Sequence, residues 1–296
     1  MIRISRFDLA DFTAPERIVQ EIIRQVSDLP IPVPIDGLAL MLDIDSITEL
    51  ETEGYEGGLL TDVEKSAGFI LVNMASPIQR RRFTIAHELI HFLCPSHKPP
   101  RGGQFLCSDG DMRLTFAREE DQVARMEVEA NRCAARLLMP EPHFRKDLRL
   151  RKGADIDHIL ALARRYDTSK EATARRYVDV QDEPCAIIVS HNGRILRFYK
   201  RGEDFPYLDV EPGSPVPHGS LTARTDLKQG VVSDSEERDG DIWLSVQRGK
   251  RTPMIYEQAL AQSDGYRLTL LTLADDPEDL KEDEELEESY TPRFKR

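Results

Sequence analysis

Residues 77–94 read PIQRRRFTIAHELIHFLC, and this stretch decides how the N-terminal part of the chain folds. Apolar residues recur in it at intervals of three and four, which predicts one long amphipathic helix. Within that helix, His87, Glu88 and His91 form the pattern H-E-x-x-H. Residues four apart on a helix differ by about 40° in direction, so both imidazoles point the same way and can hold one metal ion. Glu88 lies beside His87, where it can take a proton from water at that metal.

A second predicted helix, residues 118–139, offers the third protein ligand that a catalytic zinc ion needs beside an open water position. Glu127 and Asn131 lie one turn apart on the same face, so Glu127 can bind the metal while Asn131 supports a ligand imidazole. Glu129 is the rival ligand, but it points about 160° away from Asn131 around the helix. Taken alone, Glu127 is more simply a solvated surface residue; the H-E-x-x-H pattern reverses that preference.

The other elements are predicted from apolar periodicity and from turn residues. An opening helix has Thr13 as its expected N-cap, and residues 95–111 are expected to form a loop. Residues 141–180 have the pattern of three short helices. The pair Asn192-Gly193 is a hairpin signal. Strands are expected at 57–61, 68–73, 186–190, 195–199, 242–246, 253–256 and 266–273.

These elements predict an α+β protein of three domains and a tail. The first domain is expected to combine helices with a small sheet, the second to be helical and the third to be β-rich. Residues 276–296 are acidic and expected to be disordered or partly helical. The expected boundaries are 1–140, 141–182, 183–275 and 276–296.

Charge is unevenly distributed over the 296 residues, whose formal net charge is −13. Residues 275–288 hold ten acids and one lysine and so supply −9 of it. Residues 132–176 hold twelve basic and six acidic residues, a net of +6, which marks a candidate interaction surface. Because the chain has no apolar run of membrane-spanning length and no secretory signal pattern, we expect a cytoplasmic protein without membrane contact.

Cysteines and isolated histidines give weaker signals. The cysteines form no C-x-x-C pair, which argues against a disulfide framework and against a cysteine zinc site. We expect most of them to be buried or half-buried thiols, at Cys94, Cys107, Cys133 and Cys185. Isolated histidines are expected on the surface or in the core, at His97, His143, His158 and His191.

The stretch Arg82-Phe-Thr-Ile-Ala-His-Glu-Leu-Ile-His91, followed by Glu127-Val-Glu-Ala-Asn131, resembles the ImmA/IrrE family of metallo-endopeptidases. Members show R-F-T-x-A-H-E-x-x-H, then E-x-x-A-N with a nearby F-A-A-x-L-L-M-P. The resemblance covers residues 14–142. It departs at Ile90, where glycine is common, and at Cys133, where an aromatic residue is common. Neither departure touches an expected ligand.

The motifs and the resemblance together imply a zinc endopeptidase of the gluzincin type with a zincin-like N-terminal domain. His87, His91 and Glu127 would bind Zn²⁺, or Mn²⁺ in its place, and Glu88 would act as general base. The layout is similar to the longer, IrrE members, which carry a helix-turn-helix-like domain and a GAF-like C-terminal domain. By that analogy, the protein substrate is a helix-turn-helix repressor whose cleavage switches on stress-response or mobile-element genes.

An alternative function stays open: a DNA-binding transcriptional regulator with a structural or vestigial zinc site. Residues 159–177 resemble a helix-turn-helix pattern, which would direct Lys170, Arg175 and Arg176 to DNA. The net charge of this region is modest, and Glu171 lies on the would-be recognition helix. DNA is therefore the less favoured partner.

Overall fold

The computed structural model describes residues 4–26, 28–51, 53–99, 104–114, 117–118, 121–201, 205–245 and 252–274. These residues form seven α-helices and two β-sheets, so the predicted α+β class is confirmed. No helix among them is both long and apolar enough to cross a membrane. The acidic tail predicted at 276–296 lies outside the described residues.

Two compact units divide the chain. The first comprises Met1–Arg149 and Ala161–Arg176, and the second comprises Leu150–Leu160 and Tyr177–Arg296. The candidate site lies entirely within the first unit. The predicted boundaries after residues 140 and 182 stay predictions.

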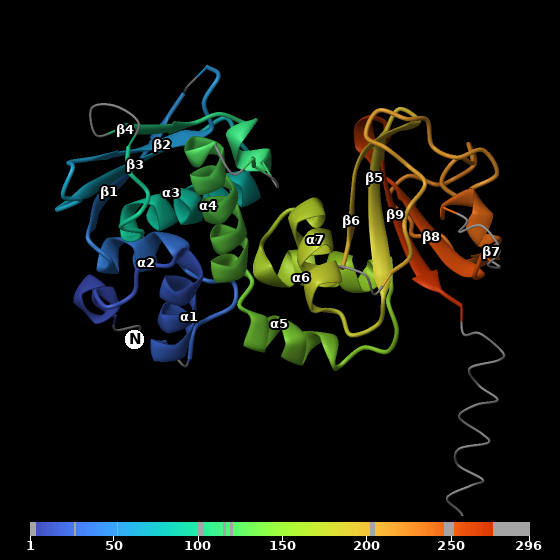
Figure 1. Cartoon of the computed structure of the whole chain (residues 1–296), viewed down its shortest axis with the longest axis horizontal. Coiled ribbons are helices and arrows are strands. Elements are labelled where there is room, and N and C mark those ends of the chain that lie inside the picture. Colours follow the sequence, from blue (N-terminus) through green and yellow to red (C-terminus); the bar gives the residue numbers. More distant parts are fainter. Residues whose placement is uncertain are drawn as a thin grey trace, which may run out of the picture. The chain divides into compact units, whose positions relative to one another are not determined.

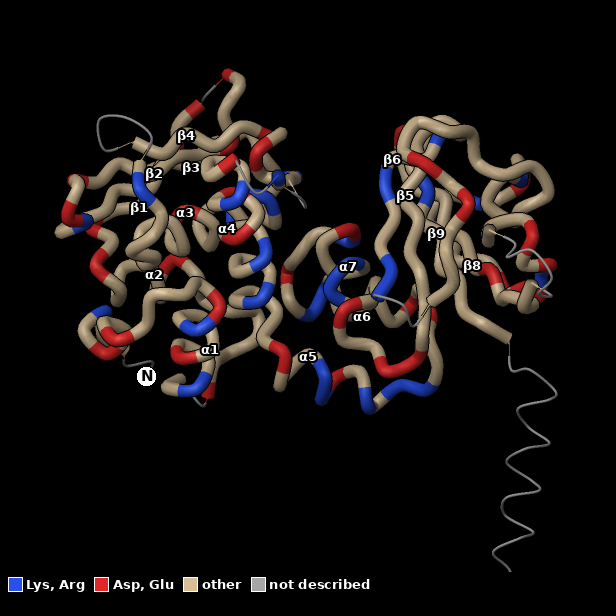
Figure 2. Tube along the Cα trace, viewed as in Figure 1, with Lys and Arg blue, Asp and Glu red and all other residues tan. Residues whose placement is uncertain are grey.

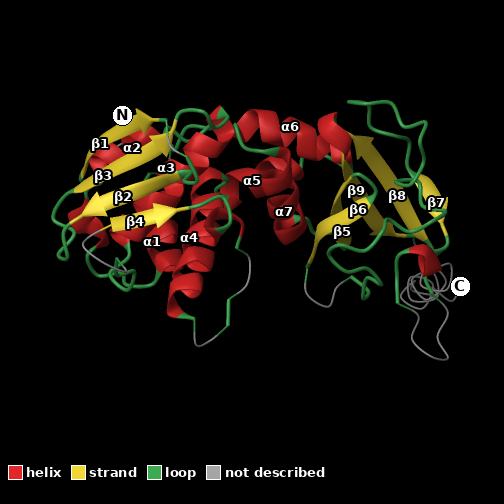
Figure 3. Ribbon diagram, turned by 90° about the horizontal axis from the view of Figure 1, so that it is seen from above, coloured by secondary structure: helices red, strands yellow, loops and turns green. Residues whose placement is uncertain are grey.

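A four-stranded sheet forms one layer of the first unit (Figures 1 and 3). Its order is β1-β3-β2-β4, with β1 and β3 parallel and the other pairs antiparallel. The strands are β1 (Ile44–Leu50), β2 (Gly57–Thr61), β3 (Gly68–Asn73) and β4 (Gln104–Cys107). The predictions for β2 and β3 are confirmed. The prediction of a continuous loop over 95–111 is wrong because β4 extends the sheet there.

Helices pack against this sheet and against one another. Helix α3 (Ile78–Leu93) packs on β2 and β3, and α4 (Gln122–Leu138) crosses and packs against α3 (Figure 1). Helix α1 (Pro15–Gln25) contacts α4, and α2 (Ile35–Met41) contacts α3. All residues from 84 to 93 are buried, so the second half of α3 is covered on every side. That burial puts the H-E-x-x-H pattern inside the unit.

The N-terminal end of α1 differs from the sequence prediction. Its N-cap is Ala14, without a side-chain hydrogen bond, so the prediction of Thr13 at that position is wrong. Pro15 instead begins the helix, where its missing N–H costs nothing. Short 3-10 helices complete the described part, namely η1 (Arg6–Leu9), η2 (Asp111–Arg113), η3 (Gly240–Ile242) and η4 (Ser263–Gly265).

The three short helices predicted after residue 140 are present as α5 (Glu141–Leu148), α6 (Ile156–Tyr166) and α7 (Lys170–Val180). Basic positions recur along α5 to α7 with acidic positions between them (Figure 2). Arg176 is buried; its Nε donates to the Met139 carbonyl at 3.3 Å, and its Nη2 lies 3.5 Å from Glu141 Oε2. Its guanidinium is engaged inside the unit, which weighs against a contact with DNA; the DNA contact of Arg176 stays a prediction.

The second unit contains a five-stranded antiparallel sheet of order β6-β5-β9-β8-β7. Its strands are β5 (Cys185–His191), β6 (Arg194–Lys200), β7 (Glu236–Arg238), β8 (Ile255–Ala261) and β9 (Tyr266–Leu273). The hairpin prediction is confirmed: Asn192 and Gly193 both have positive φ, 48° and 75°, as a two-residue type I′ turn requires.

The strand predicted at 242–246 is absent over residues 242–245, and residue 246 lies outside the described residues. Residues 240–242 form η3, and Leu244 makes only an isolated bridge with Leu208. Trp243 and Leu244 are buried in the core beside the sheet. Their apolar character therefore reflects burial in a turn, which a short apolar run cannot distinguish from a strand.

Candidate metal centre

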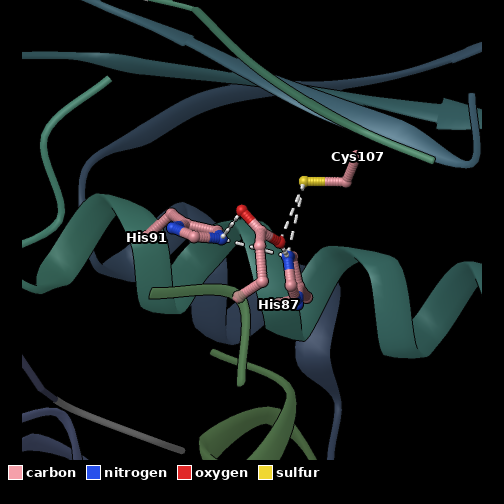
Figure 4. Close-up of side chains that lie close together, drawn as sticks. His87, His91 and Cys107 are labelled. Carbon is pink, nitrogen blue, oxygen red and sulfur yellow. Dashed lines mark hydrogen bonds and ion pairs between the residues drawn. The ribbon is translucent and has the colours of Figure 1, made fainter. Parts of the chain in front are cut away.

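Helix α3 brings both histidines of the H-E-x-x-H pattern to one point. His87 and His91 are completely buried, and their Nε2 atoms lie 3.0 Å apart. Both nitrogens therefore face the same point, where they can share a metal ion. The prediction from helical spacing therefore agrees with the position of both rings (Figure 4).

Glu127 reaches the same point from α4. Its Oε2 lies 3.1 Å from His87 Nε2, and its Oε1 lies 3.5 Å from His91 Nε2. Burial by itself raises the pKa of Glu127, but the two imidazoles outweigh it and hold this pKa well below the usual range. Glu127 is thus a buried carboxylate placed against both histidines, as the sequence predicted for a third ligand.

Cys107, at the end of β4, is the member of this group that sequence reasoning missed. Its Sγ lies 3.4 Å from His87 Nε2 and 3.8 Å from Glu127 Oε2 (Figure 4). The expectation of buried thiols is correct, because all the cysteines are buried and free. The sequence argument against a cysteine zinc site did not foresee that Cys107 lies in a cluster of possible metal ligands. It relied on C-x-x-C spacing, whereas β4 delivers a single cysteine by tertiary packing.

The donor set fits a zinc ion. One ligand atom from each of His87, His91, Cys107 and Glu127 can be chosen so that all four lie within 4.8 Å of one another. Typical Zn–N distances of about 2.0–2.1 Å and Zn–S distances of about 2.3 Å give tetrahedral edges of about 3.3–3.6 Å. With Glu127 represented by Oε2, the separations of 3.0, 3.1, 3.4 and 3.8 Å lie near those edges, and the remaining pairs lie within 4.8 Å. Imidazole, carboxylate and thiolate are all ligands that zinc accepts.

Glu88 lies next to this group without being part of it. The residue is completely buried, and among the described residues neither of its carboxylate oxygens makes a hydrogen bond of normal geometry, although the Cys107 thiol is close enough to act on its pKa. Burial raises the pKa of Glu88 to about 7, although the neighbouring His87 acts in the opposite direction. A buried carboxylate with two unpaired oxygens is costly for a fold, which points to a use for this group in chemistry.

His97 and Glu129 continue the site behind His91. His97 Nδ1 lies 3.1 Å from His91 Nδ1, and His97 Nε2 lies 3.2 Å from Glu129 Oε2. If His91 binds a metal through Nε2, its Nδ1–H donates to His97, and the His97 Nε2–H donates to Glu129. The sequence left open whether His97 lies on the surface or in the core; it is buried, and its contact with a candidate ligand was not foreseen.

Glu129 therefore has a different place from the one considered in the sequence. It does not belong to the cluster of possible ligand atoms, which leaves Glu127 as the glutamate of α4 in that cluster. Its carboxylate holds His97 instead. The opposite directions of Glu127 and Glu129 on the helix explain why they serve different histidines.

Asn131 anchors the turn that follows β4. Its Nδ2 donates to the carbonyls of Asp111 and Leu114, at 2.8 and 3.1 Å. Burial lowers the pKa of His87, but Glu127 raises it, and the net pKa is raised. The Asn131 side chain adds a smaller contribution in the same direction as Glu127. The Asn131 Oδ1 and His87 Nδ1 atoms are nevertheless both buried without a hydrogen bond of normal geometry. The predicted support of a ligand imidazole thus involves proximity rather than a formed bond.

Lys65 closes the far end of α3. Its buried ammonium donates to the carbonyls of His91 and Cys94, at 2.5 and 2.6 Å. These carbonyls belong to the last turn of the helix, where no intrahelical donor remains. Burial lowers the pKa of Lys65 to about 8. Lys65 therefore fixes the end of the helix just beyond the second histidine.

Comparisons with known proteins agree with this geometry. The model of the IrrE N-terminal-like domain, peptidase family M78, matches residues 46–177. No curated protein has a sequence that matches the chain. A solved structure titled as a Mycobacterium tuberculosis transcriptional regulator is similar in fold, with a TM-score of 0.55 and 12% identity over 90% of this chain and 79% of the other. The matched residues include the whole cluster, which is consistent with a metallopeptidase.

Proposed function

Since residues 46–177 form an IrrE N-terminal-like domain, we propose that the chain is a zinc-dependent endopeptidase of the gluzincin type. The observation that carries this proposal is the buried, unpaired carboxylate of Glu88 beside the cluster of His87, His91 and Glu127. A metal site that only stabilised the fold would need no such carboxylate. The buried, unpaired carboxylate would instead lower the stability of the unit. A zincin-like description of this domain belongs to the same proposal.

In the proposed mechanism, the cluster residues bind the metal and Glu88 transfers protons. His87, His91 and Glu127 would hold the ion, with Zn²⁺ the preferred metal and Mn²⁺ an alternative for the same ligands. When bound, the ion supplies a Lewis acid that polarises a peptide carbonyl and makes water nucleophilic near neutral pH. Glu88 accepts the proton of the attacking water on its carboxylate and then passes that proton to the leaving amine nitrogen. Its two unpaired oxygens leave it available for both transfers.

The first experiment separates metal binding from proton transfer. We expect Glu88→Gln to keep about one equivalent of zinc and to lose cleavage by about 10²–10⁴-fold, because the amide cannot take up the proton. We expect His91→Ala to lose both zinc and cleavage, and Glu127→Ala to lose most of its zinc. Elemental analysis and a cleavage assay on the same preparations measure both quantities. Cleavage by Glu88→Gln at the wild-type rate would contradict the mechanism.

We further propose that the substrate is one specific protein, a helix-turn-helix repressor in the cytoplasm whose cleavage switches on a stress-response or mobile-element regulon. The sequence resemblance supports this substrate. Incubating the full-length protein with helix-turn-helix regulators encoded nearby tests it, with Glu88→Gln as the inactive control. Broad cleavage of casein would count against a single substrate.

The remaining segments are proposed to control the peptidase. On the same resemblance, residues 141–182 form a helix-turn-helix-like domain and residues 183–275 a GAF-like domain. The helical order of α5 to α7 and the antiparallel sheet of β5 to β9 support these subtypes.

A DNA-binding regulator with a structural zinc site is the second candidate. Cys107 favours it, since four protein ligands and no open position are typical of structural zinc. The engagement of Arg176 within the first unit weighs against it. Specific DNA binding that weakens with salt and is unaffected by Glu88→Gln would support this second function.

A further inference from the structure

Cys107 is placed too specifically to be an incidental neighbour of the metal cluster. Along β4, Phe105 and Cys107 are buried while Gln104 and Leu106 are exposed, so the alternation of the strand turns the thiol inward. Its Sγ then lies 3.4 Å from His87 Nε2, within the range expected between two ligands of one zinc ion. Figure 4 shows the sulfur pointing from the sheet toward the histidines on α3.

The backbone of Cys107 is held from two sides. On one side it pairs with Gly57 of β2, and its carbonyl accepts the Glu56 N–H at 2.9 Å. Gly57 permits this position: a Cβ there would lie 2.6 Å from the Leu71 carbonyl oxygen and would also collide with Thr84 of α3. The absence of a side chain thus lets the β2–β4 pair approach the helix that carries the histidines.

On the other side, the turn after Cys107 is tied down. Ser108 N and Oγ donate to Asp111 Oδ2 at 2.8 and 2.7 Å, and the Asp111 carbonyl accepts from Asn131 of α4. Cys107 is therefore fixed between the sheet and the helix that carries Glu127. A residue held this firmly has its side-chain direction determined by the fold.

Cys107 would bind the ion as a thiolate. A thiol bound to zinc is deprotonated outright.

We propose that Cys107 is a fourth protein ligand that closes the zinc site and keeps the peptidase latent. The sulfur would occupy the position that the attacking water needs, so cleavage requires Cys107 to leave the metal. This proposal rests on the proposed function for the metal itself. It goes beyond that function because it makes the resting state of the chain an inactive one.

Replacing zinc with cobalt makes a thiolate ligand detectable by absorption spectroscopy. We expect the full-length wild type, loaded with about one equivalent of Co²⁺, to show an intense thiolate-to-cobalt charge-transfer band in the near ultraviolet. Cys107→Ser should bind cobalt without that band. Cys133→Ser is the matched control, since Cys133 is another buried thiol but lies on α4 outside the cluster, and it should keep the band. Cys107→Ala repeats the test if the serine variant melts at a lower temperature.

Closure is tested separately with acetohydroxamate, a small metal-binding probe. It should alter the visible spectrum of cobalt in Cys107→Ser, where a coordination position is open, and leave the wild-type spectrum unchanged. An equal response in both proteins would overturn the closed site. Bound cobalt without a thiolate band in the wild type would overturn Cys107 as a ligand, while leaving the zinc peptidase intact. Failure of every variant to bind cobalt would instead refute the proposed function.

Discussion

His97 offers the sharpest test of how the metal site depends on residues outside H-E-x-x-H. His97→Asn removes a ring that is completely buried between His91 and Glu129, with contacts of 3.1 and 3.2 Å. Asparagine is too short to bridge the same two groups. His91 would then lose the acceptor that orients its ring and fixes its proton on Nδ1.

The expected loss of metal affinity follows from the role of His97 as the hydrogen-bond partner of a ligating histidine. Removing the partner of a ligating histidine lowers metal affinity by about 10–100-fold, which corresponds to about 1.4–2.7 kcal/mol. Glu129→Gln keeps an oxygen that can accept from His97, so its loss should fall at the lower end of that range. Competition with a chromophoric chelator measures the zinc affinity of each variant.

His218→Asn is the matched control, because His218 is an exposed histidine in the second unit. Its zinc affinity should equal that of the wild type. Thermal unfolding of the metal-free proteins shows whether His97→Asn changes the fold. Unchanged affinity in His97→Asn would refute the chain from Glu129 through His97 to His91.

Three further predictions concern stability, measured by thermal or denaturant unfolding. Gly57→Ala should destabilise the first unit by about 1–3 kcal/mol because its new methyl meets backbone, whereas Gly37→Ala, with no atom within 4 Å of the new methyl, should not destabilise. Lys65→Met should cost about 1–3 kcal/mol because two buried carbonyls at the end of α3 lose their donor; an unchanged midpoint would contradict this. Glu257→Gln should cost about 2–3 kcal/mol, since the buried Glu257 carboxylate accepts three hydrogen bonds, two of them from Thr222.

The helical part of the site was predictable because helices convert sequence spacing into direction. His87 and His91 are four apart on α3, and this alone places their rings together. Glu127 required a second helix and the assumption that it packs against the first. Both conditions hold in the fold, so three of the four cluster residues follow from periodicity.

Cys107 and His97 could not be found that way. Both lie in the stretch expected to be a loop, and they reach the cluster through the pairing of β4 with β2 and through the path of the chain after α3. A single cysteine or histidine in such a stretch has no partner at a fixed spacing. The alternation in β4 is only four residues long and is too short to stand out as a strand.

In the rest of the fold, too, locally determined features were predictable and features that depend on packing were not. The hairpin at Asn192-Gly193 was predictable because its turn chemistry is local. The strand expected at 242–246 failed because Trp243 is buried by packing, which sequence windows do not contain. The cap expected at Thr13 failed because α1 begins at Pro15, directly after Ala14.

The cluster draws its candidate ligands from three separate elements, α3, β4 and α4. A bound ion would therefore act as a cross-link, and its binding energy would count toward holding these segments together. Without the ion, only side-chain packing and the contacts of Glu127 with His87 and His91 would hold these segments together at the cluster. Amide protons of β4 and α4 would then exchange faster with solvent. Proteases would also cleave β4 and α4 more readily, because these elements would open more often. The lifetime of the protein, and not only its activity, would follow the supply of metal.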